Sequence, residues 1–309
     1  MAGTVSLSRD GVRKFFGLSR MTHSILDVAH PAVGALLVLG AFPSVGTVVI
    51  GLLAAFAGFT AVFALNDVMD RRVDCEKMAK FSGAKDCFDI DSVGYRHPIA
   101  QGALSFNAAL GWVIAWGAAS LVLAFLLRPL CAALLVGAML LEVGYCRLLR
   151  VTHWKGILSG SMVAVGGLAG VYAVTVTPPL AFVAAFFVWA FAWEVGCRNI
   201  PNDWSDIEED ADLGVRTVPV RYGRRAASWI SFALLCLTVA ASLLFPLVAP
   251  TRHGLIYLAG ALAAGAFLLI IPAVRWVRDQ KIGSAMFLFN RACFYPLAVC
   301  GLVALLVIL

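Results

Sequence analysis

Two acidic stretches of similar spelling are the residues of this sequence best suited to chemistry. The first runs from Asn66 to Asp74 and the second from Asn202 to Asp210, and both read N-D-x-x-D-x-x-x-D. On a helix, carboxylates at positions i, i+3 and i+7 share one face, where like charges repel each other unless a cation binds. Carboxylate oxygens favour Mg²⁺ or Mn²⁺ over softer metals. The pattern therefore predicts two metal sites, with these ligands: Asn66, Asp67, Asp70, Asp74, Asp203, Asp206 and Asp210.

Magnesium in proteins is commonly held by one or two carboxylates together with waters and substrate phosphates. Two such sites facing each other would clamp a diphosphate and stabilise the charge that develops on it as it leaves. We expect Asp70, Asp74, Asp206 and Asp210 to act in catalysis. Basic residues of neighbouring segments would complete the diphosphate site: Arg71, Arg72, Arg96, Lys155 and Arg216.

The composition shows which elements must position these residues. The 309 residues are 61% apolar and only 14% charged, with a mean hydropathy of +0.89, which is typical of a polytopic α-helical membrane protein. An apolar cavity between the helices would suit an isoprenoid tail. Nine apolar stretches are long enough to span a bilayer: 22–42, 45–65, 107–127, 130–146, 157–177, 180–197, 227–248, 254–274 and 286–308.

Charge placement predicts the orientation. With the N-terminus in the cytoplasm, all but Arg128, Arg252 and Arg291 of the 24 Lys and Arg fall on the cytoplasmic side. The net charge of +6 then reflects orientation and anionic lipid rather than nucleic acid. We expect one membrane-embedded domain over 1–309 in the bilayer of a bacterial inner membrane, with the C-terminus on the far side. No obligate protein partner is evident, and no CxxC pair indicates structural zinc.

Both acidic motifs follow an apolar stretch, the second and the sixth, at the cytoplasmic side. This repetition predicts an all-α fold of two similar four-helix halves plus a ninth helix around a central cavity. The segments 67–106 and 198–225 would be cytoplasmic loops that carry the motifs and cap the cavity.

Three polar residues within or beside apolar stretches have two interpretations each. His23, Asp27 and Glu194 would line a pocket for the acceptor, since a carboxylate in a membrane helix should face the bundle interior. The alternative is structural pairing, of Asp27 with Arg20 or His23, and of Glu194 with Arg198 one turn later. The segment 147–155 is either a basic membrane anchor or, through Arg147 or Lys155, a contact for an anionic substrate group.

At these motifs the sequence resembles the UbiA superfamily of intramembrane prenyltransferases. The family pattern N-x-x-x-D-x-x-x-D matches Asn66, Asp70 and Asp74, and D-x-x-x-D matches Asp206 and Asp210. The segment 96–102, R-H-P-I-A-Q-G, resembles the family's R-P-I-x-x-G with His97 as one extra residue. The resemblance implies an all-helical fold, two Mg²⁺ ions with Mn²⁺ as a substitute, and transfer of a prenyl group from a polyprenyl diphosphate.

The second motif, from Asn202 to Gly223, is most similar to the quinone-forming branches of the superfamily, which implies an aromatic acceptor. Within the superfamily, the alternative is a non-aromatic acceptor such as a glycerol-phosphate lipid or a sugar phosphate. A transporter is the alternative from another class, but transporters place ionisable residues near the middle of the membrane on broken helices. The D-G-x-x-A-R signature of CDP-alcohol phosphotransferases is absent from the sequence.

Overall fold

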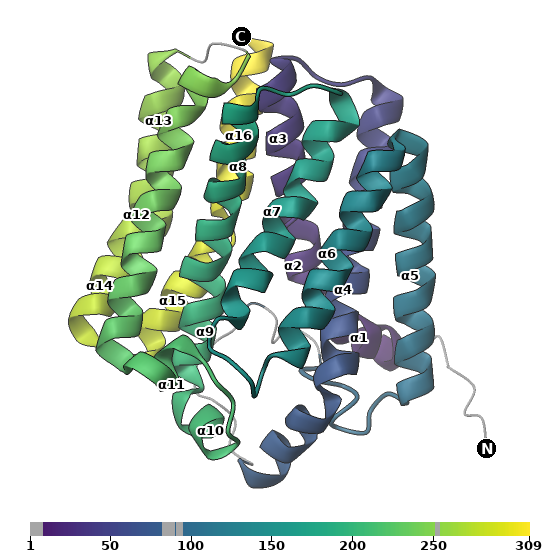
Figure 1. Ribbon diagram of the computed structural model, residues 1–309, viewed down its shortest axis with the longest axis vertical. Coiled ribbons are helices and arrows are strands. Elements are labelled where there is room, and N and C mark those ends of the chain that lie inside the picture. The colour runs from purple at the N-terminus through teal and green to yellow at the C-terminus, as the bar shows by residue number, and fades with distance from the viewer. Residues whose placement is uncertain (1–8, 82–89, 91–94, 251–253) are drawn as a thin grey trace.

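The computed structural model describes residues 9–81, 90, 95–250 and 254–309, and its regular structure over these residues is entirely helical (Figure 1). The helices are α1 (Arg9–Leu18), α2 (Met21–Leu26), α3 (Ala29–Leu39), α4 (Val45–Lys80), α5 (Phe106–Leu127), α6 (Pro129–Arg147), α7 (Lys155–Val174), α8 (Leu180–Trp193), α9 (Ile200–Ser205), α10 (Ile207–Asp212), α11 (Val218–Tyr222), α12 (Arg224–Val248), α13 (Leu255–Gly265), α14 (Ile271–Asp279), α15 (Ile282–Ala292) and α16 (Tyr295–Ile308). Two π-helical turns, Glu194–Asn199 and Ala266–Ile270, join α8 to α9 and α13 to α14.

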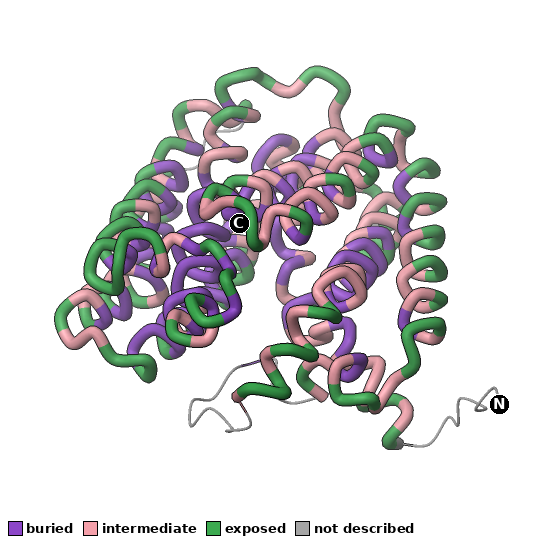
Figure 2. The backbone as a smooth tube through the Cα atoms, turned by 60° about the horizontal axis from the view of Figure 1, so that its bottom comes forward, coloured by how far each residue is buried: buried purple, intermediate pink, exposed green. Residues whose placement is uncertain are grey.

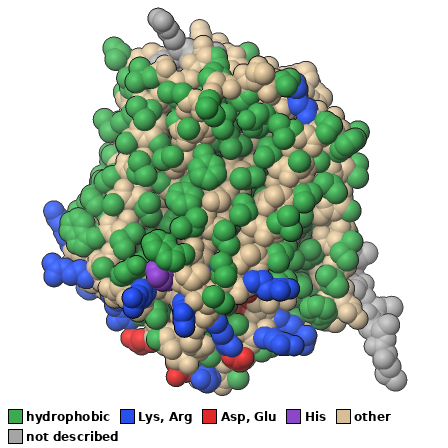
Figure 3. Space-filling model, in the orientation of Figure 1, with side chains coloured by type: hydrophobic (Ala, Val, Ile, Leu, Met, Phe, Trp, Pro, Cys, Tyr) green, Lys and Arg blue, Asp and Glu red, His purple; other side chains and the backbone are tan. Residues whose placement is uncertain are grey.

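Within the described residues, nine helical stretches are long and apolar enough to cross a membrane, which confirms the predicted all-α, nine-span architecture. Buried residues gather towards the inside of the bundle and exposed ones towards its periphery (Figure 2). The exposed positions of α5 carry large apolar side chains, among them Ile114, Val122 and Phe125. Charged side chains concentrate at the end that carries α10 and α11, below a broad apolar band (Figure 3). The outer surface is therefore suited to lipid.

Helix α4 explains how the first acidic motif is positioned. It begins at Ser44, whose hydroxyl accepts a hydrogen bond from the Thr47 amide at 3.2 Å, and it runs unbroken for 36 residues. At ~1.5 Å per residue it is ~54 Å long, whereas the bilayer core is only ~30 Å thick. Its last turns therefore extend past the apolar band. The first motif lies on this helix and not on a loop, so the predicted loop at 67–106 begins only after Lys80. Its residues 82–89 and 91–94 lie outside the described part of the chain.

Prolines interrupt the first and the ninth spans. Proline has no N–H to donate to the carbonyl four residues earlier. Before Pro31, that carbonyl belongs to Asp27 and accepts the backbone N–H and the Nδ1 of His30 instead, at 3.0 and 3.2 Å. Before Pro296, it belongs to Ala292 and accepts Trp193 Nε1 at 3.0 Å. These breaks separate α2 from α3 and α15 from α16.

The sixth span differs, since its helix continues from α8 through the π-helical turn into α9, where Pro201 lies in the first turn. All six residues of this turn are buried, including Glu194 and Arg198. Such turns widen a helix locally and often occur at functional sites. The predicted cap segment 198–225 is largely helical. The backbone N–H of Arg216 in this segment donates to the Leu149 carbonyl at 2.9 Å, and this bond connects the segment to the turn between α6 and α7.

Candidate active site

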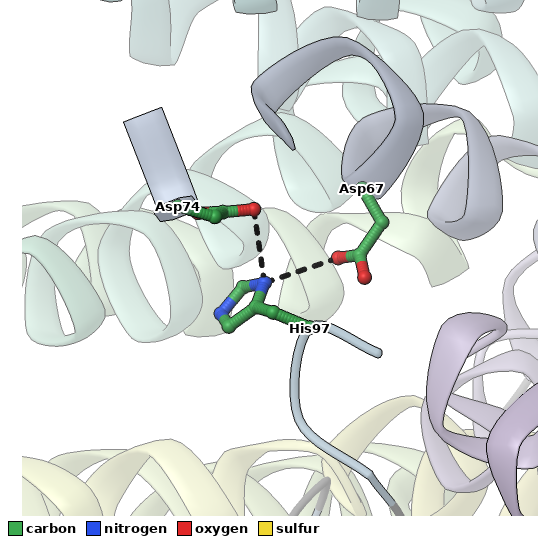
Figure 4. A group of neighbouring side chains, drawn as sticks. All are labelled: Asp67, Asp74 and His97. Carbon is green, nitrogen blue, oxygen red and sulfur yellow. Dashed lines mark hydrogen bonds and ion pairs between the residues drawn. The ribbon is translucent and has the colours of Figure 1, made fainter. Parts of the chain in front are cut away.

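The first acidic motif gathers around His97. His97 adopts the left-handed backbone conformation (φ 51°) just before Pro98, and this turn points its ring back towards α4. Its Nδ1 lies 3.2 Å from Asp67 Oδ1 and 3.1 Å from Asp74 Oδ2 (Figure 4). Burial lowers the pKa of His97, but the carboxylates of Asp74 and Asp67 outweigh burial and raise it to about 9. His97 is therefore an imidazolium at neutral pH, and a positive charge lies between the two carboxylates.

The second acidic motif folds as a bend between two short helices. Asp203 lies on α9, Asp206 at the junction and Asp210 on α10, and all three are buried. Lys77, near the end of α4, forms ion pairs with Asp206, with Glu209 at 3.1 Å and with Asp210 at 3.8 Å. The helix that carries the first motif thus contacts the second motif directly. The two sets of carboxylates share one end of the molecule, as their repetition predicts.

Lys155 lies beside the second motif and is buried. Its Nζ donates to Tyr145 Oη at 3.0 Å and lies 3.3 Å from Asp203 Oδ1. Because Lys155 is the first residue of α7 and Asp203 lies on α9, the pair joins two spans at the acidic end. The anchoring interpretation of this lysine is wrong, since an anchoring lysine would be exposed.

A second polar cluster lies on the membrane side of the acidic motifs, beside the break between α2 and α3. Arg198 Nη1 donates to Asp27 Oδ2 at 2.7 Å, and its Nε lies 3.5 Å from Glu194 Oε2. Ser159 Oγ donates to Glu194 Oε1 at 2.9 Å. The predicted pairing of Glu194 with Arg198 is confirmed, but Asp27 pairs with Arg198 rather than with Arg20 or His23. Sequence spacing could not show this, because 171 residues separate the partners.

Two carboxyl groups of this cluster share one guanidinium and keep free hydrogen-bonding capacity. Among the described residues, no hydrogen-bond donor reaches Asp27 Oδ1, and Glu194 Oε2 has only the ion pair with Arg198. Both residues are buried and line the cavity described below. Buried acceptors of this kind normally find a partner. They are therefore available to a ligand that donates hydrogen bonds.

Asn66 connects the polar cluster to the first acidic motif. Its Nδ2 donates to Glu142 Oε1 at 2.8 Å, and its Oδ1 accepts from Arg20 Nη2 at 3.2 Å. The two contacts fix the orientation of the amide. The carboxamide oxygen, predicted as a metal ligand, is thus already engaged by a cation.

One cavity of about 1030 Å³ joins these groups. Its polar end includes every predicted metal ligand, and Arg96, Lys155, His23, Asp27 and Glu194 also line it. Arg71, Arg72 and Arg216 do not line it. Arg71 stacks over the Phe106 ring at 5.5 Å, Arg72 is exposed, and Arg216 Nη1 donates to the Val151 carbonyl at 2.9 Å. His23 Nε2 lies 3.0 Å from Cys293 Sγ.

Several polar lining residues escaped prediction from the sequence, among them Lys77, His97, Glu142 and Tyr145. His97 left a signal as the extra residue in the 96–102 segment. Lys77 and Tyr145 lie on helix faces whose direction is set by packing. Glu142 lies within an apolar stretch, so its isolation was the only available sign.

The acidic end fits divalent cations by its donor chemistry. Oxygen atoms of Asp67 and Asp74 and Nδ1 of His97 lie within 4.8 Å of one another, so a divalent cation that displaced the imidazolium would meet both carboxylates. In both motifs the carboxylates already converge on a positive centre, His97 in one and Lys77 in the other. Carboxylate oxygen sets suit Mg²⁺ and Mn²⁺.

Comparison with known proteins agrees with this geometry. The model of the UbiA prenyltransferase family matches residues 29–294. A digeranylgeranylglyceryl phosphate synthase of Methanoregula boonei is 30% identical over 75% of this chain and 76% of its own length. A protoheme IX farnesyltransferase of Thioalkalivibrio sulfidiphilus is 29% identical over 97% of this chain and 94% of its own.

Solved structures show the same fold. A UbiA homolog from Aeropyrum pernix K1 superposes with a TM-score of 0.71 at 19% identity, over 92% of this chain and 98% of that one. A UbiA homolog from Archaeoglobus fulgidus, bound to GPP and Mg²⁺, superposes with a TM-score of 0.68 at 20% identity, over 94% and 99%. The family model spans most of the chain, so this protein belongs to the UbiA prenyltransferase family and is an integral membrane prenyltransferase.

Proposed function

We propose that this enzyme transfers a prenyl group from a polyprenyl diphosphate to a non-aromatic, hydroxyl-bearing acceptor, with Mg²⁺ bound at its acidic end. The observation that carries the proposal is the single cavity with two chemically different ends. Both acidic motifs and Lys155 line one end, the cluster of Asp27, Glu194 and Arg198 follows, and mainly apolar residues line the rest. A diphosphate with a long apolar tail matches both ends at once.

The residues of the acidic end would divide the work of binding the diphosphate. Asp67, Asp70 and Asp74 would hold metal on α4, and Asp203, Asp206 and Asp210 would hold it on α9 and α10. Bound Mg²⁺ would supply charge neutralisation for the departing diphosphate. The Nζ of Lys155 and the hydroxyl of Tyr145, held 3.0 Å apart, would contact its oxygens. The A. fulgidus homolog bound to GPP and Mg²⁺ supports this assignment.

The apolar walls would serve the reaction by excluding water. Departure of the diphosphate from an allylic carbon leaves a cation that water would capture. Beyond Asn66 and the Arg198 cluster, the cavity walls consist largely of Phe, Val, Leu and Ala side chains and of glycines, which bind no water. Only the acceptor would then present an oxygen to the cation.

The polar cluster around Arg198 supports a hydroxyl-bearing acceptor. The free oxygens of Asp27 and Glu194 accept hydrogen bonds, so a hydroxyl suits them, whereas the carboxylate of an aromatic acid would be repelled. The digeranylgeranylglyceryl phosphate synthases among its relatives point the same way. These observations therefore favour a non-aromatic acceptor over the quinone-type aromatic acceptor that the second motif suggested. A transporter has no support in a prenyltransferase family.

The test is a competition between acceptors. The protein in lipid nanodiscs receives labelled geranylgeranyl diphosphate, Mg²⁺ and one acceptor at a time: a prenylated glycerol phosphate, a sugar phosphate, 4-hydroxybenzoate or dihydroxynaphthoate. We expect label transfer to a hydroxyl of a non-aromatic acceptor. Transfer to the ring of an aromatic acid, with none to the alcohols, would overturn the acceptor assignment but not the assignment of prenyltransferase activity.

A further inference from the structure

We propose that Gly166 and Gly51 set the length of prenyl tail that this enzyme accepts, because they keep open two successive levels of a channel running from the diphosphate site across the membrane. The inference rests on the proposed prenyl diphosphate donor. It identifies the residues of this chain that limit the length of the prenyl tail.

The channel follows one face of each of two helices. On α4, cavity-lining residues recur every three or four positions from Asp74 through Asp70, Phe63 and Phe59 to Thr47. This is the spacing that keeps side chains on one helix face.

On α7, the lining residues recur in the same way from Lys155 through Ser159, Val163 and Gly166 to Ala173. Each stripe begins at a residue of the acidic end and reaches the opposite end of its helix. The cavity therefore extends lengthwise between α4 and α7 and is not confined to the polar end.

The two glycines mark different depths. Gly166 lies eleven residues beyond Lys155 on α7, or ~16 Å along the helix axis. Gly51 lies nineteen residues from Asp70 on α4, or ~28 Å. The hydrocarbon core of a bilayer is ~30 Å thick, so Gly166 lies near its middle and Gly51 near its far side. As the prenyl tail of the donor lengthens, it would therefore reach Gly166 before Gly51.

The open space around Gly166 and Gly51 distinguishes them from other glycines of the bundle, which allow close helix packing. A Cβ added at Gly166 or at Gly51 meets no heavy atom within 4 Å. On the same helix, a Cβ at Gly167 would lie 2.7 Å from the Phe186 ring, and one at Gly170 would lie 2.1 Å from the Pro31 carbonyl oxygen. Gly167 and Gly170 let helices approach closely. A side chain at Gly166 or Gly51 would instead enter the channel.

Gly166→Leu and Gly51→Leu test the proposal, with Gly111→Leu as the matched control. Gly111 is also a glycine with open space around it, but it is exposed on α5 and does not line the cavity. Affinities and kcat/KM are measured for a series of donors from two isoprene units upwards. Affinity comes from competition with a labelled, non-reacting thiolodiphosphate, so binding is read independently of the acceptor. Gly166→Ala provides a milder variant in case Gly166→Leu does not fold.

We expect each leucine to impose a maximum tail length, shorter for Gly166→Leu than for Gly51→Leu. Beyond that length each added unit should weaken binding by about tenfold or more, since misfit of even one methylene in an apolar pocket costs about that much. Gly111→Leu should match the wild type. Unchanged affinities for the whole donor series in both channel variants would overturn the inference, because the tail would then leave the cavity before reaching Gly166. An equal loss of affinity for the shortest donor would also overturn it, because the effect would not depend on tail length. Failure of the wild type to bind any prenyl diphosphate would instead overturn the proposed function itself.

Discussion

Replacing Lys155 by methionine removes a buried cation from beside Asp203 while preserving most of the side-chain volume. Only 2% of the Lys155 side chain and 8% of the Asp203 side chain are exposed, so Asp203 would keep a buried charge without its partner. Breaking a buried ion pair on one side costs ~3–5 kcal/mol of unfolding free energy. Lys80 offers the matched control, because its pair with Asp212 at 2.9 Å is about half exposed on both sides. Exposed pairs contribute only ~0–1 kcal/mol.

Unfolding in mixed micelles of SDS and a mild detergent measures both variants on one scale. We expect Lys155→Met to lose several times more stability than Lys80→Met. The double variant Lys155→Met/Asp203→Asn should recover part of the loss, because it removes the unpaired charge as well. Turnover should fall by about 10²–10³-fold in Lys155→Met, the typical effect of removing one donor to developing negative charge. Equal destabilisation by Lys155→Met and Lys80→Met would refute the description of a buried pair.

Three further perturbations test other parts of the molecule. Asp27→Asn should raise the KM for the acceptor while leaving donor affinity unchanged, as measured by steady-state kinetics with each substrate varied in turn. A raised KM for the donor with an unchanged KM for the acceptor would show that Asp27 contacts the diphosphate instead. Gly170→Ala should destabilise the protein by ~1–3 kcal/mol, because its Cβ would force α3 and α7 apart at Pro31, and an unchanged unfolding curve would contradict that close approach. Ser105→Ala removes the side-chain cap that accepts from the Ala108 amide at 3.3 Å and should cost ~1 kcal/mol, with Ser105→Thr nearly neutral in the same assay.

Local sequence signals were sufficient to predict the nine spans and the acidic motifs. Length and apolar composition mark a membrane helix without knowledge of its neighbours. The carboxylate spacing marks one helix face on α4, whereas the second motif bends at Asp206, yet the predicted metal ligands of both motifs line one cavity. The extent of α4 was underestimated because its last turns are polar, and hydropathy cannot follow a helix that leaves the membrane.

Side-chain partners across the bundle could not be predicted. Arg198 stands one turn after Glu194, which suggested their pairing, but its shorter contact is with Asp27 in the first span. That contact joins Asp27, at the break between α2 and α3, to Arg198 in the π-helical turn of the sixth span. Pro31 was visible in the sequence, yet the meeting of Asp27 with Arg198 is a property of packing.

The basic residues show the same limit. Lys155 and Arg96 line the cavity, whereas Arg71 and Arg72, adjacent to the acidic motif in sequence, face away from it. Successive residues on a helix point about 100° apart, so neighbours of a cavity-lining aspartate tend to face elsewhere. Proximity in sequence was therefore a poor guide to the diphosphate site.

Prenyl transfer from labelled geranylgeranyl diphosphate, measured with and without Mg²⁺ in the wild type and in Asp70→Ala and Asp206→Ala, tests the central claim most directly. The two variants remove one carboxylate from each motif, and melting in detergent verifies that each remains folded. The account predicts that wild-type transfer stops with EDTA and returns with Mg²⁺, and that both folded variants are inactive. Transfer that resists EDTA, or that continues in either variant, would contradict the assignment of the two acidic motifs to a metal-bound diphosphate.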